Sequence, residues 1–476
     1  MLKTQLEQIL DQLIFLRFEL ILISGALLLL IIGLFSKSNV AHRIAFCLAL
    51  VAALFFGTYF TEEEIVLTGS LSFGPLESFI KTLLCIFSIW IVFYSNAKKQ
   101  SSEFYFLVLA VVIGSVFMIS ANHLLVVYIS IELTSFVSYA ITNFNFKKKS
   151  FEAGIKYLLF GGTSSAIMLY GISIIYGLTG ELAIDRIELS GSDPFLAFGI
   201  VAFIGGLFFK VSIFPFHIWT PSTYQEAPTD SVAILSVVPK VAGFVLLHRV
   251  LSVIEAESIS WVIPLIAAVG IATVLVGTLG AMGQSNIKRL MAYGSIAHSG
   301  LLIGCMLISG QSGLAAFVWY VFIYAIMNLV LFYLTSVLEE KGIETIDQLS
   351  GLGKKEAYAG VLWVGVMISL IGLPPTAGFT AKFYLFTSLW NEYQIGADYL
   401  ILTFLLVAVI SVIFSLFYYL KIPYYYFIHP YRGDVGIKIE LFPKLFATIL
   451  VMLLFWFFLS PELLNNIVSN FNAVNW

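Results

Sequence analysis

The sequence has few charged residues. Only 11% of its 476 residues are Asp, Glu, Lys or Arg, whereas 60% are hydrophobic. A soluble domain carries roughly 25% charged residues, so this composition excludes a water-soluble protein and indicates an integral membrane protein. The 25 basic residues stand against 28 acidic ones, for a net charge of −3. That balance excludes a nucleic-acid-binding protein, which needs basic patches to compete for phosphate.

Cysteine is also scarce, because Cys47, Cys85 and Cys305 are isolated in apolar runs. They offer no disulfide framework, zinc ligand set or iron–sulfur spacing. The sequence contains no P-loop, no dinucleotide-binding glycine pattern and no metal-ligand spacing. We therefore expect no cofactor and no metal in this chain. Any energy it uses must come from an ion gradient or from partner subunits.

Long apolar runs make up most of the chain. About 20 consecutive apolar residues cross a hydrocarbon core of roughly 30 Å as a helix. Fourteen segments meet this criterion: 17–35, 43–60, 77–95, 104–120, 123–143, 152–178, 194–218, 229–251, 260–282, 287–308, 312–338, 360–388, 398–422 and 442–460. The sequence thus predicts an all-α polytopic protein with one membrane domain over residues 1–476.

The basic residues between these segments and at their ends predict the orientation, since cytoplasmic loops collect Lys and Arg. If the N-terminus lies outside, sixteen fall on the inner side: Lys37, Arg43, Lys98, Lys99, Lys147, Lys148, Lys149, Lys288, Arg289, Lys341, Lys354, Lys355, Lys421, Arg432, Lys438 and Lys444. Four fall on the outer side: Lys3, Arg17, Arg186 and Arg249. We therefore expect both termini on the outer face of an energy-transducing membrane, the inner membrane of a bacterium.

The other five basic residues lie further inside the predicted spans. They are Lys81, Lys156, Lys210, Lys240 and Lys382. A charge at mid-bilayer costs about 2.5–3.5 kcal/mol on insertion scales, so each is a hypothesis for a functional site. Two have a carboxylate four residues earlier. For Lys81 with Glu77 we expect a lysine that reaches the interface and pairs on its own helix; for Lys156 with Glu152, structural pairing and a pathway role stay open.

Lys240 lies at the centre of segment 229–251, and Glu132 lies near the middle of segment 123–143. A buried ammonium and a buried carboxylate at similar depth must be paired, hydrated or neutralised. An ion pair that only locks two helices is the structural alternative. Membrane helices usually associate through Ser, Thr or Asn at lower cost, which favours a functional role.

Lys210 and Lys382 each lie near a predicted helix break. Pro215 removes the hydrogen bond to the carbonyl of Val211, and prolines and glycines interrupt the chain over 372–378. Paired interrupted spans indicate a transport site built from inverted repeats. We expect two five-helix repeats of opposite topology, formed by spans four to eight (residues 104–251) and nine to thirteen (residues 260–422). Spans seven and twelve are then the interrupted ones.

These positions suggest proton translocation along Glu132, Lys210, Lys240 and Lys382. Burial disfavours the charged form of a lysine and a nearby carboxylate favours it, so a buried lysine beside a carboxylate can take up and release protons. Electrostatic interaction between neighbouring sites would couple the steps.

Two histidines inside the spans are secondary candidates. His217 lies at the predicted break, and His298 lies at the middle of span ten, which corresponds to the span of Glu132 in the repeat. Each can relay protons near neutral pH or act as a hydrogen-bonded packing residue.

Several motifs resemble the antiporter-like membrane subunits of respiratory complex I. They are 209–212 (Phe-Lys-Val-Ser), 215–221 (Pro-Phe-His-Ile-Trp-Thr-Pro), 227–229 (Ala-Pro-Thr), 288–298 (Lys-Arg-Leu-Met-Ala-Tyr-Gly-Ser-Ile-Ala-His) and 372–379 (Gly-Leu-Pro-Pro-Thr-Ala-Gly-Phe). The sequence Trp219-Thr220-Pro221 followed by Tyr224 looks like the N type of this family. Lys382 argues against the M type, which usually has a glutamate at that position. The end of the chain after segment 442–460 argues against the L type, which has a long lateral helix.

The resemblance implies a non-redox, proton-translocating membrane subunit of NADH–quinone oxidoreductase. Glu132, Lys210, Lys240 and Lys382 match the channel residues of the family, and Glu152 with Lys156 matches a further charged pair. Expected partners are an M-type subunit and small K- and J-type subunits. NADH, FMN, iron–sulfur clusters and quinone are expected in partner subunits.

One segment departs from the family pattern. Where N-type subunits commonly read Asp-Val-Tyr-Glu-Gly-Ala-Pro, residues 222–228 read Ser-Thr-Tyr-Gln-Glu-Ala-Pro. The change removes two acids and adds Glu226, so the role of those acids does not carry over. Two other functions stay open: a subunit of a multi-subunit cation/proton antiporter, and a stand-alone transporter of an organic solute.

Overall fold

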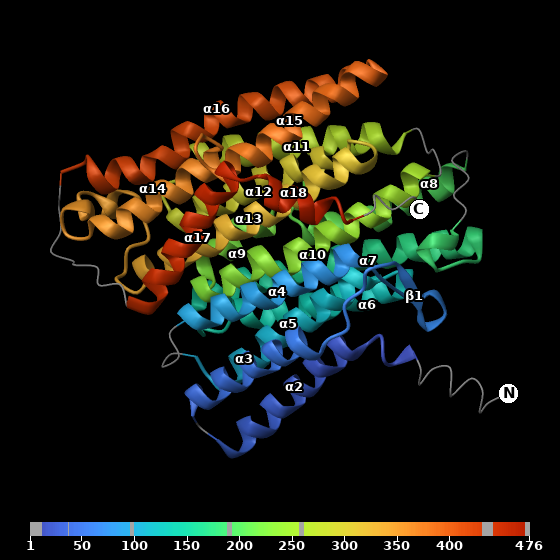
Figure 1. Cartoon of the computed structure of the whole chain (residues 1–476), viewed down its shortest axis with the longest axis horizontal. Helices are drawn as coiled ribbons and strands as arrows, with labels where there is room; N and C mark the ends of the chain where they lie inside the picture. Colours follow the sequence, from blue (N-terminus) through green and yellow to red (C-terminus); the bar gives the residue numbers. More distant parts are fainter. Residues whose placement is uncertain are drawn as a thin grey trace. The chain divides into compact units, whose positions relative to one another are not determined.

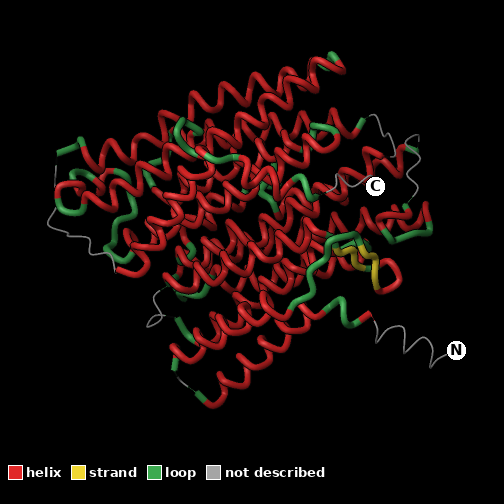
Figure 2. The backbone as a smooth tube through the Cα atoms, viewed as in Figure 1, coloured by secondary structure: helices red, strands yellow, loops and turns green. Residues whose placement is uncertain are grey.

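The described part of the chain is almost entirely helical. The computed structural model describes residues 12–36, 38–95, 100–187, 193–256, 261–430 and 441–471. Within these ranges the backbone is a series of α-helices and one short two-stranded sheet (Figures 1 and 2). Six basic residues used in the orientation argument lie outside the described ranges: Lys3, Lys37, Lys98, Lys99, Arg432 and Lys438.

The structure divides into two compact units. Among the described residues, unit 1 comprises 12–211 and 234–256 with their gaps, and unit 2 comprises 212–233 and 261–471 with theirs. Unit 1 contains α2 (Arg17–Phe35), α3 (Asn39–Phe56), α4 (Pro75–Tyr94), α5 (Ser102–Ser120), α6 (Leu124–Thr142), α7 (Lys148–Thr179) and α8 (Pro194–Lys210). The long helix α10 (Thr229–Ala256) begins in unit 2 and continues in unit 1.

Unit 2 contains the remaining helices. They are α9 (Trp219–Glu226), α11 (Val262–Met282), α12 (Ile287–Cys305), α13 (Gly310–Glu339), α14 (Ala357–Ile371), α15 (Ala377–Gly396), α16 (Tyr399–Phe427), α17 (Leu441–Leu459) and α18 (Glu462–Val468). Short 3₁₀ turns occur at Leu67–Gly69, Ile184–Arg186, Asp347–Leu349 and Leu352–Lys354. In this unit α11 packs against α12 and α16, and α13 packs against α15 and α17.

The prediction of a polytopic helical membrane protein is confirmed. Among the described residues, ten helices are long and apolar enough to cross a membrane, and an eleventh span arises if α17 and α18, bent by 84°, count together. Two further apolar helices, α8 and α14, are shorter because each ends at a break. Predicted segments 194–218 and 360–388 each contain a break: the first covers α8 and the turn after it, and the second covers parts of α14 and α15.

Both predicted breaks are present. Helix α8 ends at Lys210, and the chain then turns through Ser212, whose φ of +60° is rare for a side-chain-bearing residue. The helix therefore ends before Pro215, where sequence alone placed the disruption. Helix α14 ends at Ile371, and Gly372 follows with a φ of +87°, a left-handed conformation that glycine adopts without strain.

A small hairpin was not predicted. Strand β1 (Glu64–Val66) pairs antiparallel with β2 (Leu71–Phe73), with Ile65 opposite Ser72. Val66, Leu71 and Phe73 are buried in a small apolar cluster with Leu16. The hairpin thus packs on Leu16, the residue before α2, and leads directly into α4.

The pairing of α7 with α8 depends on glycine and gives a first prediction. A Cβ on Gly171 would stand 2.5 Å from the amide nitrogen of Phe203 and 2.6 Å from the carbonyl oxygen of Gly199. Backbone atoms cannot move aside, so we expect Gly171→Ala to separate the helices at a cost of about 1–3 kcal/mol. A Cβ on Gly162 of the same helix would meet nothing within 4 Å. Membranes should yield less folded protein on detergent extraction for Gly171→Ala than for Gly162→Ala, and equal amounts would contradict this account.

Candidate functional site

Lys210 and Glu132 lie together in unit 1. Lys210, the last residue of α8, is buried, and its ammonium donates a hydrogen bond of 3.2 Å to the hydroxyl of Ser135 on α6. Glu132, one turn earlier on α6, is half-buried and accepts a hydrogen bond from Ser165 on α7. The negative charge of Glu132 acts on Lys210. Glu132 therefore lies near Lys210, while the hydroxyl of Ser135 is the direct partner of the lysine.

Lys240 is buried at the middle of α10, where the side chains on every face of the helix are enclosed. Pro239 precedes it inside the helix, so the carbonyl of Leu235 lacks its helical donor. One turn further along, a Cβ on Gly243 would stand 3.5 Å from Cγ of Lys210. The absence of a side chain at Gly243 thus lets α10 approach the stem of Lys210, and this part of α10 also carries Lys240.

Lys382 lies in unit 2 and closes the end of a broken helix. Its ammonium donates hydrogen bonds to the carbonyl oxygens of Leu370 at 2.9 Å and Ile371 at 2.8 Å, the last two residues of α14. A cation is favoured there because the carbonyl end of a helix carries partial negative charge. Gly372 leaves space for the lysine stem, since a Cβ on it would be 2.6 Å from Cδ of Lys382.

The two lysines at the breaks share a position that the sequence did not reveal. Lys210 precedes its break in sequence and Lys382 follows its own. Lys210 belongs to the last turn of α8, and the ammonium group of Lys382 lies at the last carbonyl oxygens of α14. Each lysine is thus associated with the half-helix that precedes its break. Partners of both are neutral: a hydroxyl for Lys210 and carbonyl dipoles for Lys382.

His298 belongs to a buried cluster of tyrosines in unit 2. Its Nδ1 lies 2.9 Å from the hydroxyl of Tyr320, and its ring also contacts Tyr324. The Tyr324 hydroxyl is 2.7 Å from that of Ser295. These hydroxyls give the histidine a polar neighbourhood inside an apolar helix bundle, so it is a relay candidate with hydrogen-bonding neighbours.

The other secondary candidates differ in exposure. His217 lies in the turn between α8 and α9, half-buried, and stacks on Phe214. Glu152 and Lys156 form the predicted pair on α7, with 3.2 Å between Oε1 and Nζ and with both side chains more than half exposed. The pair thus lies on the exposed surface of unit 1, whereas Lys210 and Lys240 of the same unit are buried.

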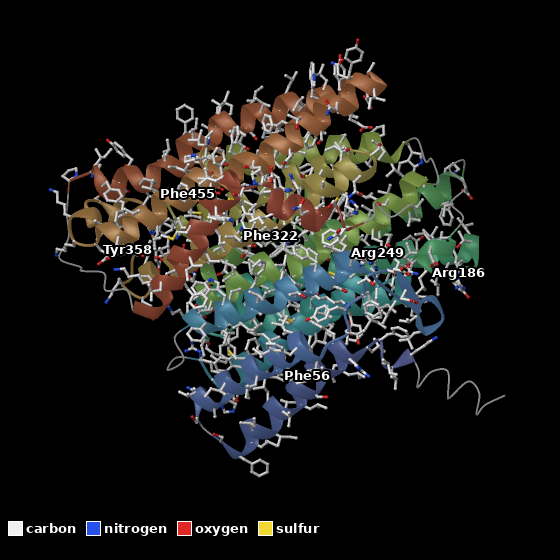
Figure 3. All side chains as sticks on the ribbon, in the orientation of Figure 1. Phe56, Arg186, Arg249, Phe322, Tyr358 and Phe455 are labelled. Carbon is white, nitrogen blue, oxygen red and sulfur yellow. The ribbon has the colours of Figure 1, made fainter. Side chains whose placement is uncertain are left out.

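Two predictions about charged residues of unit 1 are wrong. Lys81 pairs with Glu19 of α2 at 2.6 Å and not with Glu77, because the packed helix offers a nearer carboxylate than its own preceding turn. Arg249, labelled in Figure 3, is buried on α10 and pairs with Glu77; it is not an outer-loop residue. Its position near the end of an apolar run gave the loop assignment.

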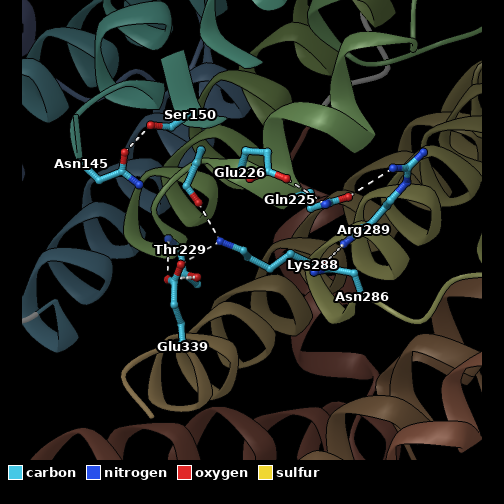
Figure 4. Close-up of polar contacts among 10 residues, drawn as sticks. Asn145, Ser150, Gln225, Glu226, Thr229, Asn286, Lys288, Arg289 and Glu339 are labelled. Carbon is cyan, nitrogen blue, oxygen red and sulfur yellow. Dashed lines mark hydrogen bonds and ion pairs between the residues drawn. The ribbon is translucent and has the colours of Figure 1, made fainter. Parts of the chain in front are cut away.

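Lys288 is also buried, although the sequence placed it in a loop. Its ammonium donates to the carbonyl of Ala227 at 2.7 Å and to Glu339 at 2.9 Å (Figure 4). Glu339 accepts from the amide of Thr229 at 3.1 Å and from its hydroxyl. The pair therefore joins the end of α9, the start of α10, the start of α12 and the end of α13.

The altered segment 222–228 has a defined arrangement. Gln225 accepts a hydrogen bond of 3.2 Å from Arg289 and donates one of 2.8 Å to Glu226 (Figure 4). The amide of Gln225 thus links the acid at Glu226 to the guanidinium, where the family pattern has a glutamate at position 225. Among the described residues, no group of three or more His, Cys, Asp or Glu side chains comes together to hold a metal ion.

Comparison with known families identifies the fold. The sequence profile of the family described as NADH:quinone oxidoreductase/Mrp antiporter, transmembrane, matches residues 121–411. This range is more than half of the chain and contains all eight candidate site residues. The chain belongs to this family.

Individual relatives agree with this assignment. NADH-quinone oxidoreductase subunit N of Pelagibacter ubique is 31% identical over 98% of this chain and 100% of its own length. A subunit N of Rhizobium meliloti is 34% identical over 85% of this chain and 86% of its own length.

Among solved structures, respiratory complex I from Thermus thermophilus matches with a TM-score of 0.80 and 27% identity, over 94% of this chain and 98% of that chain. The Mrp complex from Dietzia has a TM-score of 0.82 at 19% identity, over 95% and 96% of the two chains, and thereby shows the shared fold.

Proposed function

We propose that this protein is a proton-translocating membrane subunit of NADH–quinone oxidoreductase. The observation that carries the proposal is the placement of Lys210, Lys240 and Lys382, three buried lysines, two of them at helix breaks, in a chain whose relatives are named as subunit N of that enzyme. A buried charge in a membrane helix is costly, so its presence favours a role in moving ions or protons.

The relay runs through Glu132, Lys210, Lys240 and Lys382. Lys210 and Lys382 bond to neutral groups, and among the described residues no carboxylate forms an ion pair with either one. The protonation of such a lysine responds to changes of charge nearby, and Glu132 supplies a charge that acts on Lys210. Ser135 and Ser165 can pass or orient protons between these groups. Glu152, Lys156, His217 and His298 are secondary sites on this pathway.

The proposal includes fourteen spans, with both termini on the outer face and inverted repeats over residues 104–251 and 260–422. Two sets of contacts support the directions of the spans. Glu19, Lys81 and Arg249 meet in one cluster, and all three lie at helix ends assigned to the outer side. Lys288, Glu339 and Thr229 meet in another, at helix ends assigned to the inner side.

We place the chain in a bacterial inner membrane beside an M-type antiporter-like subunit and small K- and J-type subunits. In this assignment the chain has no redox centre of its own. NADH, FMN, iron–sulfur clusters and quinone act in partner subunits, and the free energy of that chemistry drives the protons. The similarity to multi-subunit membrane complexes supports assembly with partners.

The second candidate is a subunit of a cation/proton antiporter. It is favoured by the family description, which names Mrp antiporters, and by the Dietzia fold match. A subunit of this kind would contain the same buried lysines but would have different partner subunits and would transport a different ion.

One experiment separates the two. The tagged chain is purified from its native membrane, the subunits that accompany it are identified, and the complex is reconstituted into vesicles. We expect redox subunits to accompany it and NADH oxidation by quinone to drive proton movement without added sodium. Absence of redox subunits together with sodium-dependent proton movement would overturn the proposal in favour of the antiporter.

A further inference from the structure

Unit 1 contains a second group of buried charges that the relay does not use. Glu19 of α2, Lys81 and Glu77 of α4, and Arg249 of α10 are each no more than 6% exposed. Lys81 donates to Glu19 over 2.6 Å, and Arg249 pairs with Glu77 and donates to the carbonyl of Ala121 at 2.9 Å. The charges of Glu77 and Arg249 also act on Lys81. The four groups therefore form one electrostatic cluster that joins α2, α4 and α10.

Glu19 has a buried carboxylate oxygen that is free to accept a proton. Both Arg249 and Glu77 are held by their mutual pair, and an arginine does not release its proton in proteins. Lys81 donates to Glu19 and also lies 4.2 Å from the ring centroid of Phe73. Oε2 of Glu19 is buried and has no hydrogen-bond partner among the described residues. A carboxylate oxygen left in this state is costly to bury unless it binds a proton or a donor.

The cluster also reaches the surface. Gly74 precedes α4, and the point where its Cβ would stand is 2.7 Å from Oε2 of Glu77 and 3.3 Å from Cγ of Glu63. Glu63 is exposed in the loop before β1. Partial burial of this carboxylate and the nearby charge of Glu77 raise the pKa of Glu63. An exposed carboxylate with a raised pKa beside a buried one is suited to exchange protons with water.

We propose that Glu19 is a proton-binding site through which unit 1 exchanges protons with the outer face, by way of Glu77 and Glu63. This inference rests on the proposed function, since it adds an outward-facing site to a cluster that includes Arg249, a residue of the helix that carries Lys240. Uptake forms one O–H bond on the Glu19 carboxylate, and release to water breaks it. Lys81 stays an ammonium throughout, so the cluster is neutral after release and carries one extra positive charge while loaded.

The other charged or titratable groups around Glu19 and Lys81 are not the proposed binding site, although Glu77 lies on the route to it. From α4 they are Lys81, Glu77 and the thiol of Cys85, which lies one turn beyond Lys81, and from α10 Arg249. The alternative is a clamp that only holds α2, α4 and α10 together. The two roles predict different results when the ion pair is replaced by neutral groups. A clamp tolerates this replacement with little loss of stability, whereas a proton site loses its ability to bind the proton.

The test uses the assembled complex in sealed membrane vesicles, with proton translocation measured per NADH oxidised. The variants are Glu19→Gln and the double variant Glu19→Gln/Lys81→Gln, which leaves no unpaired buried charge. Glu344→Gln, at an exposed carboxylate in the loop after α13, is the control for loss of an acid. We expect both Glu19 variants to lose roughly ten-fold or more of coupled proton translocation, because a positioned proton-transfer group contributes about 10²–10⁴-fold. The control should match wild type.

Wild-type translocation in the double variant, with normal amounts of complex, would overturn the proton site and leave the clamp. If Glu19→Gln alone fails to assemble, the double variant decides. If the double variant also fails to assemble, Glu19→Asp is compared with wild type by pH-difference infrared spectroscopy, which detects the carbonyl stretch of a protonated carboxylic acid. A band unchanged from wild type would overturn the site. Lys240→Met is measured in parallel. Normal translocation in that variant would contradict the proposed function itself, whereas its loss together with a normal double variant would contradict only this inference.

Discussion

Replacement of Lys240 by methionine is expected to abolish coupled proton translocation while leaving the complex assembled. Methionine has nearly the same length and no charge, so it fills the enclosed space at the middle of α10 without a buried ion. If Lys240 passes protons, its loss should reduce translocation by roughly ten-fold or more. Lys341→Met, at an exposed lysine after α13, is the control and should behave as wild type.

The variant Lys240→Arg distinguishes a proton carrier from a fixed charge. Arginine keeps the positive charge but does not release a proton at physiological pH. We expect this variant to be as inactive as Lys240→Met, as measured by acidification of vesicles during NADH oxidation. Rescue by arginine would assign Lys240 a purely electrostatic role, and normal translocation in Lys240→Met would remove it from the pathway.

The buried lysines could be found from sequence because a charge inside a long apolar run is conspicuous. Lys210, Lys240 and Lys382 were identified in this way, and the structure buries all three. The hydrogen-bond partners of Lys210 and Lys382 could not be found, because those partners come from other helices. Ser135, the partner of Lys210, is 75 residues away in sequence.

The same limit explains the wrong pairing of Lys81. Spacing along one helix favours Glu77, four residues earlier, but Glu19 is supplied by the packing of α2, 62 residues away. Arg249 and Lys288 were placed in loops because each lies near the end of an apolar run. Burial at a helix end depends on which other helix ends meet there, and neither hydropathy nor charge counting contains that information.

Helix breaks were partly predictable. Pro215 and the prolines after Gly372 indicated interruptions, since proline cannot donate to the helix ladder. Pro239 also lies inside an apolar run, yet α10 continues through it. Neighbouring helices and side chains can satisfy the freed carbonyl in a membrane protein, so proline alone does not decide whether a helix ends. The positive φ of Ser212 and of Gly372 marks the places where it does.

Lys382→Met should affect both the stability of unit 2 and proton translocation. Lys382 donates to the two final carbonyls of α14, and methionine would leave these buried oxygens without a donor, at about 1–3 kcal/mol each. We expect a lower midpoint of thermal inactivation of the purified complex. At temperatures where the complex remains assembled, we also expect coupled proton translocation to fall roughly ten-fold or more.

The two readouts separate two roles for this lysine. A residue that only closes the end of α14 would change the midpoint and leave translocation per NADH unchanged in the assembled complex. Lys382→Arg can donate to both carbonyls but cannot release a proton, so it should recover the midpoint without recovering translocation. Lys354→Met, at an exposed lysine in the turn before α14, is the matched control and should change neither. Translocation retained in Lys382→Arg would show that the charge at the break acts on the pathway without carrying its protons.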